Sequence, residues 1–100
     1  MDVYHAIADG NRRKLLELLS ERERSVQELM PHFDVTMGAV SQHLKILRAN
    51  GLVARRKQGR FRFYRASPKA LQEVHGWTEQ YRQFWDSSLD RLGDYLDKKA

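Results

Sequence analysis

Residues 36–50, TMGAVSQHLKILRAN, with Gly51 directly after them, are the stretch that decides the fold. Val40, Leu44 and Leu47 recur there at steps of four and three, the spacing of one helix face, and the apolar residues Ala39 and Ile46 lie beside them. The opposite face is small, polar and partly cationic: Gly38, Ser41, Gln42, Lys45 and Arg48. Thr36 is a suitable N-cap and Gly51 a suitable left-handed terminator. We therefore predict a helix with one face in the core and the other on a partner.

Length and composition place this helix in a small protein. The chain has 100 residues, which indicates one domain over residues 1–100, and it contains no cysteine. The lack of cysteine excludes disulfides, thiolate metal sites and cysteine nucleophiles. No apolar run approaches the ~20 residues of a membrane span, and no signal-peptide pattern follows Met1. We expect a soluble, cytoplasmic protein without membrane contact.

The positive charge of the chain is concentrated in one segment. Residues 35–66 contain no acid, so all thirteen acids lie elsewhere. Eight of the eighteen Lys and Arg residues lie in this segment, namely Lys45, Arg48, Arg55, Arg56, Lys57, Arg60, Arg62 and Arg65. A solvated basic loop is one interpretation of such a run. An acid-free stretch beside a polar helix face favours a polyanion as partner.

The residues before this segment predict further helices. Residues 3–8 form a short apolar helix, and residues 12–19 are dense in leucine, which indicates a helix buried on much of its circumference. Ser25 and Glu28 have the spacing of a capping box, so we expect the next helix to begin at Val26. Pro31 belongs near the end of that short helix. The order predicted is helix, tight turn, helix.

After Gly51 the pattern changes to that of a β-hairpin. Residues 52–57 and 60–65 are extended in pattern and are joined by Gln58 and Gly59, a two-residue connection. Phe61 and Phe63 share one face of the second strand, and we expect that face on the helices. The other face carries Arg60, Arg62 and Tyr64 and is expected to point outward.

The last third of the chain predicts one long helix. Ser67 is its expected N-cap and Pro68 lies in its first turn, and apolar residues recur at helical intervals up to residue 98. A helix over 68–98 has roughly 30 residues and a length of about 45 Å, more than this domain can cover. Its aromatic residues need a second chain, although an effector pocket is the alternative use of Trp77, Tyr81, Phe84 and Trp85.

Together these motifs resemble the winged helix-turn-helix of the ArsR family of bacterial and archaeal transcriptional repressors. The resemblance covers residues 3–67 and is carried by VSQHLKIL at 40–47, NGLV at 50–53 and the basic hairpin at 55–64. Residues 84–96, FWDSSLDRLGDYL, are similar to the metal-independent, SdpR-like autorepressor branch of the family. The implied fold is mainly α, with a two-stranded β-wing and a long C-terminal dimerisation helix over 68–98.

The resemblance also implies a function: a dimeric, autoregulatory repressor that binds double-stranded operator DNA with inverted-repeat symmetry. The implied DNA contacts are Thr36, Met37, Gly38, Ser41, Gln42, Lys45, Arg48, Arg60 and Arg62. The implied dimerisation residues on the terminal helices are Val3, Tyr4, Ile7, Trp77, Tyr81, Phe84, Trp85, Leu89 and Leu92. For Ser41 and Gln42 an ordinary solvated helix face is the alternative, and strand position can turn Arg55, Arg56 and Lys57 away from DNA.

The histidines do not predict a metal site. Zinc takes three or four ligands, whereas His5, His32 and His75 are scattered and no cysteine is present. His43 belongs to the family motif, and we expect it packed and hydrogen-bonded. We expect no cofactor, no metal and no enzymatic activity. Two alternatives stay open: a ligand- or metal-responsive derepressor with an unidentified effector, and a protein-interaction module with non-specific nucleic-acid contact.

Overall fold

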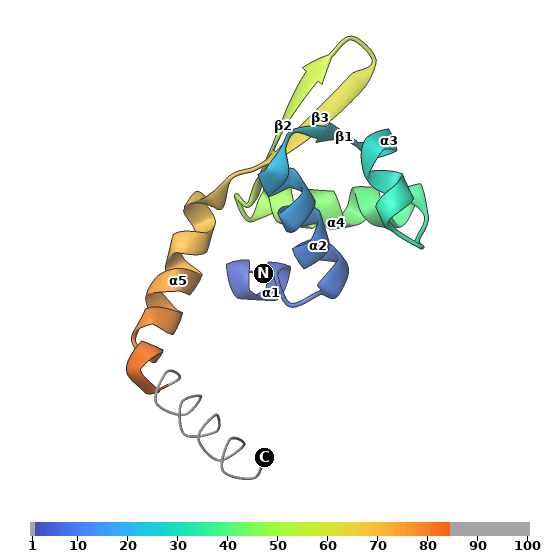
Figure 1. Cartoon of the computed structure of the whole chain (residues 1–100). Coiled ribbons are helices and arrows are strands. Elements are labelled where there is room, and N and C mark those ends of the chain that lie inside the picture. Colours follow the sequence, from blue (N-terminus) through green and yellow to red (C-terminus); the bar gives the residue numbers. More distant parts are fainter. Residues whose placement is uncertain (1, 85–100) are drawn as a thin grey trace.

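The structure, a computed structural model, describes residues 2–84 (Figure 1). Its elements in chain order are α1 (Val3–Ala6), α2 (Gly10–Glu21), β1 (Arg24–Ser25), α3 (Val26–Leu29), the 3-10 helix η1 (Met30–His32), α4 (Met37–Ala49), β2 (Val53–Gln58), β3 (Phe61–Ala66), η2 (Pro68–Ala70) and α5 (Leu71–Glu79). The mainly helical, winged architecture is confirmed. No helix among these residues is long and apolar enough to cross a bilayer. The predictions for Trp85, Leu89, Leu92 and the rest of 85–98 lie outside the described residues.

The apolar face of α4 lies at the centre of the core. Val40, Leu44 and Leu47 are completely buried, as the spacing of the sequence predicts. They pack with equally buried leucines from α2, from α3 and from the residue after Gly51: Leu15, Leu29 and Leu52. The helix-turn-helix is thus held together by contacts between apolar side chains that are far apart in sequence.

The helix ends predicted from the sequence are present. The Thr36 hydroxyl accepts a hydrogen bond from the Ala39 amide at 3.1 Å, and Gly51 has φ of 73°. The capping box is complete, because the Glu28 amide donates to Ser25 Oγ and the Ser25 amide donates to Glu28 Oε1. These bonds satisfy backbone donors that the first turn of a helix leaves without an intrahelical partner.

The wing contains one strand more than we predicted from the sequence. Arg24 and Ser25, of which Ser25 was predicted only as a helix cap, form β1, which pairs antiparallel with Tyr64 and Phe63 of β3. The strand order is β1-β3-β2, so β3 is central. A strand of two residues has no detectable alternation of its own, and only its pairing with a distant segment reveals it.

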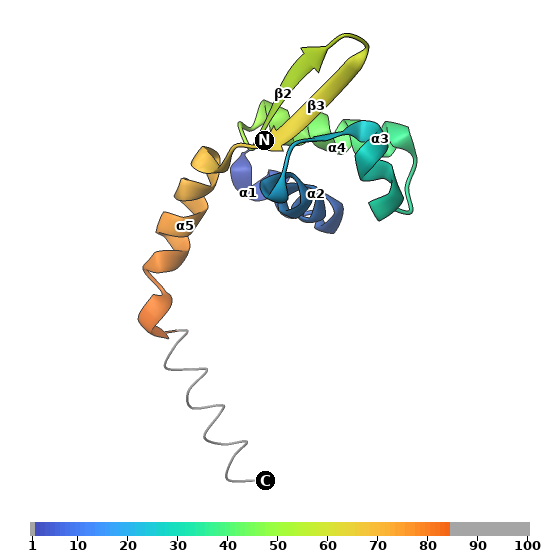
Figure 2. The ribbon, with the colours of Figure 1, turned by 45° about the horizontal axis from the view of Figure 1, so that its top comes forward.

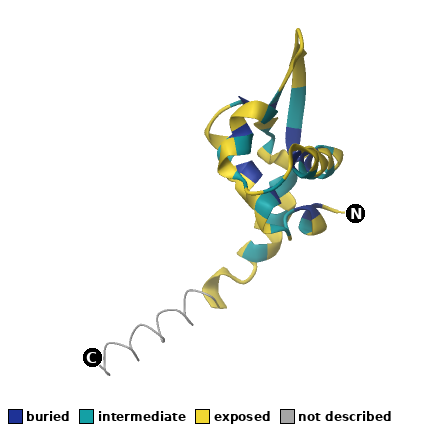
Figure 3. Ribbon diagram, turned by 90° about the vertical axis from the view of Figure 1, so that its right-hand side faces the viewer, coloured by how far each residue is buried: buried dark blue, intermediate teal, exposed yellow. Residues whose placement is uncertain are grey.

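The predicted hairpin connection and strand faces were each wrong. Gln58 pairs with Phe61, so the connection is Gly59 and Arg60, with Gly59 at φ of 61°. Tyr64, predicted outside, is 7% exposed and packs in the core, whereas Phe61, predicted inside, is 55% exposed. The face of β3 that carries Arg62 and Tyr64 is the one turned toward α4, so the predicted orientation of the strand was reversed. Tyr64 is also nearer the base of the hairpin, which lies on the helices, whereas the tip extends past them (Figure 3).

The predicted long helix is interrupted within the described residues. The α5 helix ends at Glu79, a turn at Gln80 and Tyr81 follows, and residues 82–84 are helical again. At this end the Thr78 hydroxyl and the Gln80 amide donate to main-chain carbonyls, of His75 and Trp77, and so compete with helical bonding. Ser67 makes no capping bond, since its extended backbone continues from β3 and donates to Leu52 O.

The two serines allow a matched test of the caps. We predict that Ser25→Ala lowers the free energy of unfolding by about 1 kcal/mol, because it leaves the Glu28 amide without its cap. Ser67→Ala is the control and should stay within about 0.5 kcal/mol of the wild type. Urea denaturation followed by circular dichroism measures both variants. Equal losses would contradict the role of the capping box.

Candidate nucleic-acid interface

The face of α4 opposite the core is open to solvent. Of the α4 residues that we predicted to contact DNA, Arg48 is half-buried. The others are exposed, and they are Met37, Gly38, Ser41, Gln42 and Lys45. Exposure and burial therefore alternate around this helix as its sequence predicts. Side chains of this length and polarity at the N-terminal part of a helix suit the reading of base edges in a major groove.

The hairpin stands beside this face and supplies the second element of the interface (Figure 2). Arg60 lies in the turn at its tip, and Arg62 follows on β3. A cleft of about 220 Å³ separates α4 from the sheet. Its lining residues, which come from α3, α4, β2 and β3, are Val26, Ser41, Lys45, Arg48, Arg55, Arg62 and Tyr64.

A second hollow of about 160 Å³ lies nearer the wing tip. It brings the predicted contacts Met37, Ser41, Arg60 and Arg62 together with residues we did not predict, Val26, Gln27 and Phe61. Thr36, Gly38 and Gln42 line neither hollow. Phe61 was missed because an aromatic residue in an alternating strand is normally assigned to the core. Its place one residue after the turn was the signal that it would be exposed.

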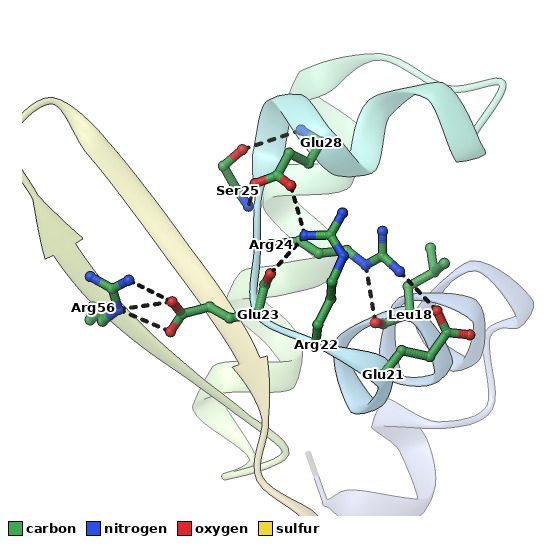
Figure 4. A network of polar contacts seen from close by, with 8 residues as sticks. All are labelled: Leu18, Glu21, Arg22, Glu23, Arg24, Ser25, Glu28 and Arg56. Atoms are coloured by element: carbon green, nitrogen blue, oxygen red, sulfur yellow. Dashed lines mark hydrogen bonds and ion pairs between the residues drawn. The ribbon is translucent and has the colours of Figure 1, made fainter.

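Arg56 is engaged by other side chains of the protein, so we do not propose it as a DNA contact. Its guanidinium donates to both carboxylate oxygens of Glu23, at 2.6 to 3.0 Å, and lies over the Phe63 ring at 4.7 Å (Figure 4). Arg22 pairs with Glu28 and Arg24 with Glu21 in the same network. These cations hold the wing and the α2–α3 link in place.

Comparison with known proteins agrees with this geometry. The sequence model of the arsR family of bacterial regulatory proteins matches residues 9–55. The HTH-type transcriptional regulator Rv2034 of Mycobacterium tuberculosis is 33% identical over 97 residues, which cover 97% of this chain and 88% of that protein. The chain belongs to the ArsR family. It is a DNA-binding transcriptional regulator.

Other similar ArsR-family proteins cover nearly the same length. The transcriptional repressor SdpR of Bacillus subtilis is 28% identical over 88 residues, 88% of this chain and 98% of that protein. The crystal structure described as a possible transcriptional regulator for arsenical resistance is 41% identical, with a TM-score of 0.70 and 88% of each chain covered. The ArsR-family assignment therefore includes the wing and part of the C-terminal segment.

A buried arginine fixes α4 of this ArsR-family chain to its N-terminal helix. Arg12 donates from Nε to the Ala6 carbonyl at 2.6 Å and from Nη2 to that of His5 at 3.2 Å. Its Nη1 lies 3.2 Å from His43 Nδ1. Because a guanidinium has no acceptor, His43 Nδ1 accepts and the ring proton is on Nε2. The packed, hydrogen-bonded His43 expected from the sequence is confirmed.

The predicted dimerisation residues divide into two groups. Val3 is 5% exposed inside the core of its own chain, and Tyr4 and Ile7 are half-buried. Tyr4 contacts Trp77 edge to face at 6.0 Å, which joins α1 to α5. The residues that expose large aromatic surface are Trp77, Tyr81 and Phe84, at 50%, 41% and 66%. Among residues 2–84, no three His, Asp or Glu side chains are grouped to hold a metal ion.

The ion pair of Glu23 gives the wing a dependence on pH. Hydrogen bonds from Arg56 hold the pKa of Glu23 below its ordinary value of 4.5. A carboxylate with a lowered pKa in the folded state stabilises the fold above its unfolded-state pKa, and this stabilisation disappears as pH falls through the folded-state pKa. We predict that Glu23→Gln lowers Tm at neutral pH and that its difference from the wild type vanishes in acid.

Thermal denaturation at a series of pH values tests this prediction. Glu17→Gln, a change at an exposed glutamate of α2, is the control and should give a small difference that is the same at each pH. A Glu23→Gln difference that persists unchanged in acid would show that the ion pair does not stabilise the wing.

Proposed function

We propose that this regulator is a homodimeric repressor that binds an inverted-repeat operator, including that of its own operon, in the cytoplasm. In the complex α4 lies in the major groove and the wing lies on the neighbouring backbone. The observation that carries this proposal is the exposed polar face of α4 beside the wing cations Arg60 and Arg62, which form no ion pair within residues 2–84. Regulators with related sequences support it, because one is named a transcriptional repressor and another an arsenical resistance operon repressor.

Each element has its own task in this proposal. Ser41 and Gln42 present hydrogen-bonding groups to base edges, since a glutamine amide can pair with adenine through two hydrogen bonds. Lys45 and Arg48, farther along α4, contact phosphates. Arg60 at the wing tip adds charge without reading sequence. No cofactor or metal takes part.

The dimer is proposed from the aromatic surface of α5. Trp77, Tyr81 and Phe84 leave ring surface in water that burial would stabilise by roughly 25 cal/mol per Å². Trp77 also touches Tyr4 of α1, so both terminal helices contribute to one surface. Trp85, Leu89 and Leu92 continue the sequence pattern. A two-fold dimer places two α4 helices on half-sites about one helical turn apart, ~34 Å.

The base-reading role of α4 is tested on two DNAs. We predict that Gln42→Ala weakens binding to the operator, recovered from genomic DNA retained by the protein, by about 1–3 kcal/mol and leaves binding to random DNA nearly unchanged. Arg60→Ala should weaken both complexes to a similar extent, because phosphates are common to all sequences. Isotherms at several salt concentrations measure this.

Gln72→Ala, a change at an exposed glutamine of α5, is the matched control and should bind both DNAs like the wild type. If Gln42→Ala leaves the ratio of operator to random affinity unchanged and Arg60→Ala abolishes that ratio, sequence is read through the wing and the proposed roles are reversed.

Assembly is tested with two exposed phenylalanines. We predict that Phe84→Ser raises the dimer dissociation constant, because it removes apolar surface from the subunit contact, and that Phe61→Ser on the wing does not. Analytical ultracentrifugation of both full-length variants over a range of concentrations measures the effect. A well-folded wild-type monomer at micromolar concentration would refute the dimer.

A further inference from the structure

The cleft between α4 and the wing concentrates positive charge from three elements. Lys45 and Arg48 come from α4, Arg55 from β2 and Arg62 from β3. Arg55 lies opposite Tyr64 in the β2–β3 register, and residues directly opposite each other lie on the same face of a sheet. Arg62 is two residues from Tyr64 on β3 and therefore shares that face, which is turned toward α4. The sequence spreads the four cations over 18 positions, and folding gathers them.

Within residues 2–84, the charged side chains of these four residues make no hydrogen bond or ion pair with a protein group. Other arginines in that part of the chain are engaged by carboxylates or main-chain carbonyls, and they are Arg12, Arg13, Arg22, Arg24 and Arg56. The cleft therefore gathers four cations that no carboxylate among the described residues compensates.

The register of the hairpin makes this absence costly. Arg62 and Lys57 are directly opposite on β3 and β2, and like charges in that position destabilise a sheet. Arg55 is half-buried, which further disfavours an uncompensated charge. An anion held in the cleft removes both penalties.

Neutral donors complete the lining. Tyr64 is 7% exposed, yet its hydroxyl has no hydrogen-bond partner among the described residues and is not sealed from solvent. Ser41 adds a second hydroxyl. Guanidinium and ammonium groups only donate, so the cleft offers donors from six side chains and no carboxylate acceptor.

We propose that this cleft is a binding site for a phosphate-class oxyanion, held by Arg55 and Arg62 from the sheet and by Lys45 and Arg48 from α4, with the Tyr64 hydroxyl as a neutral donor. Its volume of about 220 Å³ is below the ~300–1,000 Å³ usual for drug-sized ligands, so a compact anion fits best. The occupant is a backbone phosphate of bound DNA or the phosphate group of a small molecule. Only the DNA source rests on the function proposed above.

Two arginines of the sheet provide a matched pair of variants. Arg55→Gln removes a cation from the cleft. Arg65→Gln removes the same charge from the next cross-strand pair, where Arg65 lies opposite Ala54, is exposed and does not line the cleft. Thermal melts of both full-length variants first establish that each is folded.

The first measurement uses inorganic phosphate without DNA. Amide chemical shifts of the labelled full-length protein are followed on adding sodium phosphate, with sodium chloride at equal ionic strength as the reference. We expect saturable shifts at Ser41, Lys45, Arg55 and Arg62 with phosphate only. Arg55→Gln should weaken phosphate binding roughly tenfold, the loss expected for a charge-assisted hydrogen bond, and Arg65→Gln should not.

The second measurement is the salt dependence of binding to a random-sequence duplex. If a DNA phosphate occupies the cleft, Arg55→Gln should reduce the slope of log K against log salt by about one per bound protomer, and Arg65→Gln by less. If Arg55→Gln weakens only the binding of inorganic phosphate, the cleft holds the phosphate group of a small molecule. If it changes only the salt dependence of DNA binding, the cleft holds a phosphate of the DNA backbone. Either result supports the anion site, and neither depends on whether Gln42→Ala confirms that α4 reads bases. If Arg55→Gln and Arg65→Gln are equivalent in both measurements, the proposal is overturned.

Discussion

The burial of one face of α4 is the constraint on which the rest of this structure depends. A helix of 13 residues is marginal in water by itself, and tertiary packing must stabilise it. Val40, Leu44 and Leu47 achieve this by complete burial against leucines of α2, α3 and the start of the hairpin. Because those residues must face inward, the intervening polar residues must face out. The position of the exposed polar surface of α4 is thus a consequence of core packing.

Electrostatic pairing divides the arginines of this chain into structural and functional sets. Arg12, Arg24 and Arg56 are anchored by carbonyls or carboxylates, and they hold α1, the β1 link and the wing in place around α4. Arg55 and Arg62 have no such partner in the described residues and face a cleft. The same side-chain chemistry serves rigidity in one set and anion recognition in the other, and the presence of a carboxylate or carbonyl oxygen within hydrogen-bond distance decides which.

Much of the fold and part of the interface could be predicted from local patterns. The α4 helix, its Thr36 cap, the Ser25–Glu28 capping box and the left-handed Gly51 depend on residues within four positions of one another, and each was predicted correctly. The exposed residues of α4 follow from the same periodicity. The third strand, the turn at Gly59 and Arg60, and the end of α5 at Glu79 were not predicted, because pairing partners and competing side-chain bonds decide them.

The sequence by itself determined the helical periods, the helix caps, the family motifs and the acid-free basic segment, because each is a relation between neighbours along the chain. Only the tertiary structure decided which face of β3 meets the helices, burying Tyr64 and exposing Phe61. It also decided that Glu23 neutralises Arg56, 33 positions away, and that Arg55 is left free beside α4. The reason is that burial and charge pairing depend on distance in space, which spacing in the sequence does not specify for segments that meet only after folding.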